Sequence, residues 1–298
     1  MGHRRPPLRG LRLRAMLGAA VLAVASVPLA GGVAYAGAGT AATAAAVGHA
    51  AEGGRVVVRD DLRKVFREAG VTGTFALLDV ARNRTVVVDQ ARANRRLIPA
   101  STFKIPHALI ALETGAVADE NEVIPYGGQP QPIPEWERDM NLRDAIKVSN
   151  VPVFQTLARR IGIKRERQWL NRLGYGNRQV GTKVDRFWLD GPLKISAVEQ
   201  TRFLSRLARL RLPAAKKHQR TVRELVKVEQ TKKYTLYAKT GWGSATEPGI
   251  GWWVGWVERD GRVYAFALNI DVVKDADAEK RIPVARKLLT RLGVLPAS

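Results

Sequence analysis

A serine and a lysine stand three residues apart in Ser101-Thr102-Phe103-Lys104, at the head of an apolar run from 105 to 112. On a helix this spacing puts the hydroxyl and the amine on one face, one turn apart, so the amine can take the serine proton. Serine needs an adjacent base to be a nucleophile, and lysine becomes a base when apolar burial removes its charge. The pair therefore predicts nucleophilic catalysis by Ser101. The plainer alternative is an N-cap serine followed by a solvated lysine.

Four further stretches have residue types suited to a site. They are Ser149-Asn150-Val151, Tyr175-Gly176-Asn177, Phe187-Trp188-Leu189-Asp190-Gly191, and Lys239-Thr240-Gly241 followed by Trp242. Gly241 would let a ligand approach the edge of a strand, while Lys239 and the neighbouring hydroxyl could bind an anion. Each stretch also has a plain alternative, with Lys239 at the surface, Ser149 as an N-cap and Trp188 as a core aromatic residue.

Strand patterns occur near both ends of the chain, and helical patterns occur between them. The expected strands cover residues 72–80, 85–88, 234–239, 251–258 and 262–271, and an amphipathic helix is expected over 276–292. The order predicts an α+β fold, in which one antiparallel sheet is built from both ends of the chain. Terminal helices should flank the sheet, with an inserted helical lobe at about 116–230. One catalytic domain is expected over 56–298.

The first 36 residues have the pattern of a secretory signal peptide. Five arginines precede an apolar run from 15 to about 30, and the small-x-small triplet Ala34-Tyr35-Ala36 follows. The run is short against the roughly 20 residues that cross a bilayer, so cleavage after Ala36 is favoured over a membrane anchor. We therefore expect export, with residues 37–55 as a flexible lead-in.

Composition narrows the chemistry further. The 298 residues contain no cysteine, which excludes thiol catalysis and disulfides, and the four histidines share no metal-ligand spacing. A zinc hydrolase and a Ser-His-Asp triad are thus disfavoured, no metal is expected, and His107 is interpreted as a packing residue. The net charge of +22 suggests weak attraction to anionic wall polymers. No nucleic-acid motif accompanies it, so a solvated basic surface is the simpler interpretation.

Together, S-x-x-K, a serine triplet and K-T-G in this order are the signature of penicillin-recognising serine acyltransferases. In detail the chain resembles the class D β-lactamases, or oxacillinases, from about Asp61 to the C-terminus. It does not resemble class A, because its triplet is Ser149-Asn150-Val151 rather than S-D-N. Glu166 lies in the charged run 164–167, where a solvated side chain is expected instead of a deacylating base.

The resemblance implies a role for each site residue. Ser101 would attack the β-lactam carbonyl, and the backbone N–H groups of Ser101 and Trp242 would form the oxyanion hole. Lys104 would be carboxylated by carbon dioxide, or bicarbonate, to serve as general base, with no other cofactor. Trp188 would donate its indole N–H to the carbamate.

The remaining residues of the resemblance would bind and orient the substrate. Val151 would supply apolar wall, and Ser149 would relay a proton toward the leaving nitrogen. Lys239, Thr240 and Gly241, with an arginine of the last helix, would hold the substrate carboxylate. Register places that arginine at Arg281, with Arg286 as the alternative.

Three other functions fit parts of the pattern. One is a penicillin-binding or sensor protein of the same fold that is acylated without turnover, and another is a wall transpeptidase or carboxypeptidase. The third is a basic, non-catalytic polymer-binding protein. Hydrolysis of small-molecule β-lactams would separate the enzyme from all three.

Overall fold

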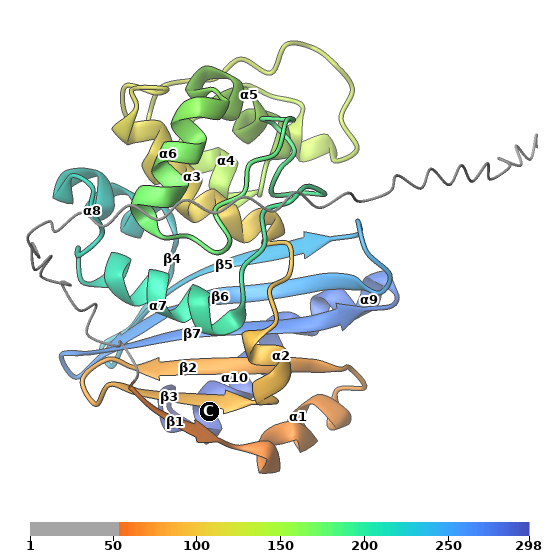
Figure 1. Ribbon diagram of the computed structural model, residues 1–298, viewed down its shortest axis with the longest axis vertical. Coiled ribbons are helices and arrows are strands. Elements are labelled where there is room, and N and C mark those ends of the chain that lie inside the picture. The colour runs from red at the N-terminus through yellow and green to blue at the C-terminus, as the bar shows by residue number, and fades with distance from the viewer. Residues whose placement is uncertain (1–53, 298) are drawn as a thin grey trace, which may run out of the picture. The chain divides into compact units, whose positions relative to one another are not determined.

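The structure, a computed structural model, describes residues 54–297 and contains one seven-stranded sheet. The strand order is β1-β3-β2-β7-β6-β5-β4, so the N-terminal and C-terminal parts of the chain meet where β2 pairs with β7 (Figure 1). The strands are β1 (Arg55–Val58), β2 (Gly73–Asp79), β3 (Arg84–Val88), β4 (Lys227–Gln230), β5 (Thr235–Gly243), β6 (Gly249–Arg259) and β7 (Arg262–Val272).

The sheet built from both chain ends is confirmed, and the structure adds two edge strands that were not predicted, β1 and β4. β2 pairs antiparallel with β3 and β7, and the pairs β7–β6, β6–β5 and β5–β4 are also antiparallel. β1, however, pairs parallel with β3, so the sheet is mixed. This edge strand has only four residues, and both Val56 and Val58 are exposed. Buried and exposed side chains therefore do not alternate along it as they would in a half-buried strand. A short, mostly exposed strand carries too little hydrophobic pattern for its pairing to be predicted.

Helices occupy the chain between β3 and β4, as predicted, and also both ends of the described part. They are α1 (Arg63–Glu68), α2 (Gln90–Asn94), α3 (Lys104–Glu113), α4 (Leu142–Lys147), α5 (Val151–Ile161), α6 (Ile163–Leu173), α7 (Ala197–Ala208), α8 (Lys216–Leu225), α9 (Asp275–Glu279) and α10 (Arg281–Arg291). The expected single helix at 276–292 is thus two helices, α9 and α10, with Lys280 between them. None of the helices within residues 54–297 is long and apolar enough to cross a membrane.

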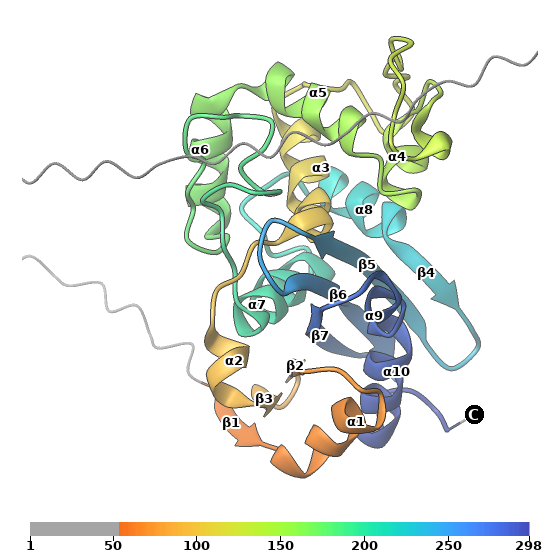
Figure 2. The ribbon, with the colours of Figure 1, turned by 90° about the vertical axis from the view of Figure 1, so that its right-hand side faces the viewer.

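The two faces of the sheet are covered by different helices. α7 packs on one face, whereas α1 and α10 lie on the other (Figures 1 and 2). α7 begins with a capping box, in which Ser196 accepts from Glu199 N–H and the Glu199 carboxylate accepts from Ser196 N–H. α10 buries Val284 and Leu288, which are one turn apart, against the sheet. Two hydrophobic cores result, and the larger one continues into the helical lobe.

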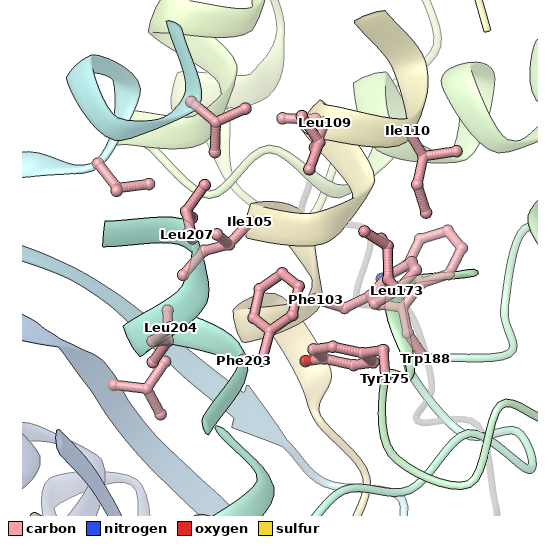
Figure 3. Close-up of a cluster of buried hydrophobic side chains, with 14 of the residues drawn as sticks. Phe103, Ile105, Leu109, Ile110, Leu173, Tyr175, Trp188, Phe203, Leu204 and Leu207 are labelled. Atoms are coloured by element: carbon pink, nitrogen blue, oxygen red, sulfur yellow. The ribbon is translucent and has the colours of Figure 1, made fainter. Parts of the chain in front are cut away.

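Helix α3 is the central helix of that larger core. Every residue from Lys104 to Leu112 is buried, and Gly115 ends the segment with a φ of 66°. Figure 3 shows Phe103, at the start of this helix, gathered with Tyr175, Trp188 and Phe203 from other segments. The first turn of α3 is therefore held from several sides, which fixes the direction of its side chains.

Candidate active site

Ser101 and Lys104 lie together at the start of α3. Ser101 belongs to a 3-10 turn, η2 (Ala100–Phe103), and the Lys104 Nζ atom lies 2.8 Å from the Ser101 Oγ atom. Lys104 has no exposed surface, which rules out the alternative of a solvated lysine. Burial, and secondarily the charge of Lys239, hold the pKa of Lys104 well below its usual value. A largely neutral amine at hydrogen-bond distance can accept the serine proton.

Lys239 and Ser149 form a second pair across the site. The Lys239 Nζ atom donates to Ser149 Oγ and to the Thr240 carbonyl, at 3.0 Å in each case. Burial, helped by the positive charge of Arg281, lowers the pKa of Lys239 to about 7. Ser149 has a φ of 57° between α4 and α5, an uncommon backbone conformation for a residue other than glycine. The N-cap of α5 is the next residue, Asn150, whose side chain accepts from Val153 N–H.

Gly241 lets strand β5 approach the turn that carries Ser101. A Cβ atom at this position would lie 3.0 Å from Thr102 Cγ2 and 3.1 Å from the Pro99 carbonyl oxygen. Both contacts are closer than ordinary van der Waals distance, and the second is with backbone. The glycine of K-T-G is therefore required for the sheet edge and the serine turn to lie side by side.

The arginine predicted near the K-T-G strand is Arg281 by position. Its guanidinium donates to the Gly241 carbonyl at 2.7 Å, and it has no carboxylate partner among residues 54–297. Gly251 makes room for it, because a Cβ there would lie 3.0 Å from Arg281 Cδ. The alternative, Arg286, is engaged in an ion pair with Glu229. Burial lowers the pKa of Arg281, but its guanidinium remains a cation at neutral pH.

Trp188 is connected to Ser101 through the backbone and through aromatic packing. Its carbonyl accepts from Ala100 N–H at 3.0 Å, and its ring lies 5.6 Å from that of Phe103. The indole is fully buried, yet its N–H has no hydrogen-bond partner within the described part of the chain. A buried donor without a partner is costly, so it marks a place where an acceptor belongs.

The tight turn at residues 175–177 holds the loop that carries Trp188. The Asn177 side chain donates to the Pro192 carbonyl at 2.7 Å and accepts from Lys194 N–H at 3.0 Å. Tyr175 is buried against Phe103, with ring centroids 5.7 Å apart. The turn therefore positions Trp188 from a distance and does not itself reach Ser101.

Val151 and Trp242 are at the rim of the site. Val151 is the first residue of α5 and is half-buried, while Trp242 follows Gly241 on β5 with 45% of its surface exposed. A pocket of about 560 Å³ shares Lys239 and Thr240 with the site, but Ser101, Val151 and Trp242 do not line it. α4, α8, β4, β6 and α10 contribute most of its remaining lining, which includes the basic residues Arg143, Lys147, Lys227 and Arg286.

This geometry can be set beside known proteins. A family model described as the penicillin binding protein transpeptidase domain matches residues 73–290. β-Lactamase OXA-5 of Pseudomonas aeruginosa is 43% identical over 78% of this chain and 88% of its own length. β-Lactamase OXA-48 of Klebsiella pneumoniae is 40% identical over 78% of this chain and 87% of its own length.

Solved structures agree with these relatives. The class D β-lactamase FUS-1 (OXA-85) of Fusobacterium nucleatum subsp. polymorphum superposes with a TM-score of 0.78 at 37% identity, over 80% of this chain and all of its own. A class D β-lactamase from Nostoc gives a TM-score of 0.77 at 39% identity, over 78% of this chain and 99% of its own. The chain belongs to the class D β-lactamase family. It is a serine β-lactamase, that is, a β-lactam hydrolase.

One prediction about this class D β-lactamase is wrong. Glu166 is not solvated but fully buried, with its Oε1 atom 2.8 Å from Nε2 of the equally buried His107. The signal was present in the sequence, because Glu166 has the i, i+4, i+7 spacing with Leu170 and Leu173, the other buried residues of α6. The charged neighbours in the run hid that periodicity.

The residues that hold the serine turn were not predicted from the sequence. The Gln200 side chain donates to Thr102 Oγ1 at 2.9 Å, and that hydroxyl donates to the Pro99 carbonyl at 2.7 Å. No motif reveals this link, because α7 supplies Gln200 and the contact exists only in the folded chain. Within residues 54–297, no group of three or more histidine, aspartate or glutamate side chains could hold a metal ion.

Proposed function

We propose that this β-lactamase forms an acyl-enzyme on Ser101 and hydrolyses it with Lys104, in its carboxylated form, as the general base. The observation that carries the proposal is the fully buried Lys104 amine at 2.8 Å from Ser101 Oγ, where burial holds its pKa well below the usual value. Only a neutral amine adds to carbon dioxide, and an apolar chamber both neutralises the amine and shelters the product.

The surroundings of Lys104 suit a carbamate. The unpartnered indole N–H of Trp188 is a buried donor that could hold one of its oxygens. The Phe154 ring lies 5.3 Å from Lys104 Nζ and, with Val151, provides apolar wall. Such a group supplies an anionic base beside Ser101, whereas the buried Glu166 and His107 face each other at 2.8 Å.

The other residues would bind and orient the β-lactam. Ser101 attacks the carbonyl, and the backbone N–H groups of Ser101 and Trp242 stabilise the oxyanion, on the order of 3 kcal/mol each. Ser149, held by Lys239, returns a proton to the leaving nitrogen. Arg281 and Thr240 hold the substrate carboxylate at the β5 edge, with Lys239 adding charge.

Export and surface attraction are proposed on the sequence alone. The signal peptide at 1–36 and most of the lead-in at 37–55 lie outside the described residues. We expect mature protein recovered outside the cytoplasm to begin at Gly37, and Edman sequencing or mass spectrometry would identify that residue. The basic surface would attract anionic wall polymers weakly, in a salt-dependent manner.

Penicillin hydrolysis by the mature protein, with and without bicarbonate, tests the mechanism. We expect turnover that increases with bicarbonate and disappears in Lys104→Ala. Stable acylation of Ser101 without turnover, seen by mass spectrometry, would instead identify a penicillin-binding or sensor protein.

A further inference from the structure

His107 and Glu166 form a buried pair next to the catalytic helix turn. Both side chains have no exposed surface, and 2.8 Å separates His107 Nε2 from Glu166 Oε1. His107 lies one turn after Lys104 on α3, and Glu166 belongs to α6. The pair thus joins the catalytic helix to a helix that contributes no residue to the site described above.

The pair is expensive to bury, and its polar atoms are poorly satisfied. Although Nε2 and Oε1 are within ion-pair distance, neither makes a well-aligned hydrogen bond. His107 Nδ1 and Glu166 Oε2 also have no partner within residues 54–297. Replacing such a buried pair with apolar side chains is often neutral or stabilising, so fold stability alone gives little reason for it.

The His107 ring contacts Trp188 and also Phe154, the ring that borders Lys104. Its centroid lies 5.1 Å from the Trp188 ring, edge to face, and 5.6 Å from the Phe154 ring. Phe154 is the ring beneath Lys104 Nζ, and Trp188 carries the unpartnered N–H. A rotation of the imidazole would therefore disturb the packing of both, since interiors are close-packed.

We propose that Glu166 and His107 are positioning residues for carboxylation of Lys104. Glu166 fixes the rotation of the His107 imidazole, and the imidazole holds Trp188 with its N–H available to the carbamate. This inference rests on the carboxylation proposed above and adds to it a second pair of residues on α3 and α6.

The chain offers a matched control at the other end of α3. His218 Nδ1 of α8 lies 2.7 Å from Glu113 Oε1 of α3, so this second histidine–glutamate pair also joins α3 to another helix. Glu113 is the last residue of α3, and neither member contacts Trp188 or Phe154 among the ring contacts of the described chain. Removing this pair perturbs α3 without touching the Lys104 chamber.

The experiment measures carboxylation directly, by titrating each protein with ¹³C-labelled bicarbonate and following the lysine carbamate signal by NMR. The two test variants are Glu166→Met, whose side chain cannot bind the imidazole, and Glu166→Gln, whose amide can. The matched controls are Glu113→Met and Glu113→Gln. We expect the half-saturating bicarbonate concentration to rise about tenfold in Glu166→Met, or about 1.4 kcal/mol, because the carboxylate that fixes the imidazole is gone. In Glu166→Gln this concentration should stay within about threefold of the wild-type value, and in both Glu113 variants it should equal the wild-type value.

The outcomes separate this inference from the mechanism beneath it. A carbamate signal in wild type that is unchanged in Glu166→Met would overturn the positioning role and leave carboxylation intact. No signal in wild type at any bicarbonate concentration would overturn carboxylation itself, and the positioning role with it. If Glu166→Met does not fold, the double variant His107→Leu/Glu166→Leu decides, because it leaves no buried charge. It should unfold near the wild-type temperature yet require more bicarbonate, and wild-type bicarbonate affinity would refute the proposal.

Discussion

The Nζ atom of Lys239 lies 3.0 Å from the Oγ atom of Ser149, a residue 90 positions earlier in the chain. The contact joins the sheet to the helical lobe close enough to Lys104 that, in addition to burial, the charge of Lys239 lowers the pKa of that amine. It also gives Ser149 a partner whose charge depends on pH near neutrality, because burial lowers the pKa of Lys239 to about 7. Substrate binding and proton relay should therefore both respond to the state of one amine.

The first prediction concerns the pH dependence of substrate capture. Lys239 is charged below its pKa of about 7 and loses its charge as the pH rises through that value. Its attraction for the substrate carboxylate is thus present at lower pH and lost at higher pH. We expect kcat/KM for carboxylate-bearing β-lactams to fall above about pH 7, by up to about tenfold per unit. In Lys239→Arg, whose guanidinium keeps its charge, this fall should be absent. Parallel profiles in both proteins would contradict the assignment.

The second prediction separates the two arginines of α10. Arg281 donates to the Gly241 carbonyl and has no carboxylate partner within residues 54–297, whereas Arg286 is paired with Glu229. Arg281→Ala should raise KM for carboxylate-bearing substrates by about 10- to 100-fold, the loss of a charged hydrogen bond. Arg286→Ala should leave KM near its wild-type value and serves as the control. Steady-state kinetics on both variants decides, and the reverse order would move the carboxylate site to Arg286.

The third prediction isolates the indole N–H of Trp188. Trp188→Phe keeps an aromatic ring against Phe103 and Phe187 but removes the buried donor. We expect the bicarbonate concentration for half-maximal turnover to rise about tenfold or more, because a hydrogen bond to a charged group is lost. Pre-steady-state kinetics should show deacylation slowed more than acylation. If deacylation proceeds at the wild-type rate, the indole has no role in holding the base.

The fourth prediction tests the close approach of β5 to the serine turn. In Gly241→Ala the new methyl group would meet Thr102 Cγ2 at 3.0 Å and the Pro99 carbonyl oxygen at 3.1 Å. Overpacking of this kind costs about 1–3 kcal/mol, and here the strain falls on the turn that holds Ser101. The acylation rate should drop at least about tenfold, with a lower unfolding temperature. Stopped-flow acylation with wild-type kinetics would show that the strand edge and the turn can separate without consequence.

Local sequence determined the parts that depend on near neighbours along the chain. The S-x-x-K spacing places Ser101 and Lys104 on one helix turn, and the structure has them 2.8 Å apart. Alternating and apolar runs predicted the sheet built from both chain ends, because strand and helix periods act within a few residues. The parallel edge strand β1 escaped prediction, since it buries too little to leave a pattern.

Only the tertiary structure decided which charged groups lose contact with water. Lys104 stands between apolar residues in the sequence and Glu166 between two arginines, yet both side chains are fully buried. Their chemistry follows from that burial, because desolvation disfavours a charge, and packing partners from distant segments do the desolvating. The contact of Lys239 with Ser149 and that of His107 with Trp188 have the same origin. The sequence alone predicted Ser101 as the nucleophile and Lys104 as its base, and the packing of helices α3, α5 and α6 with β5 decided the environment of both.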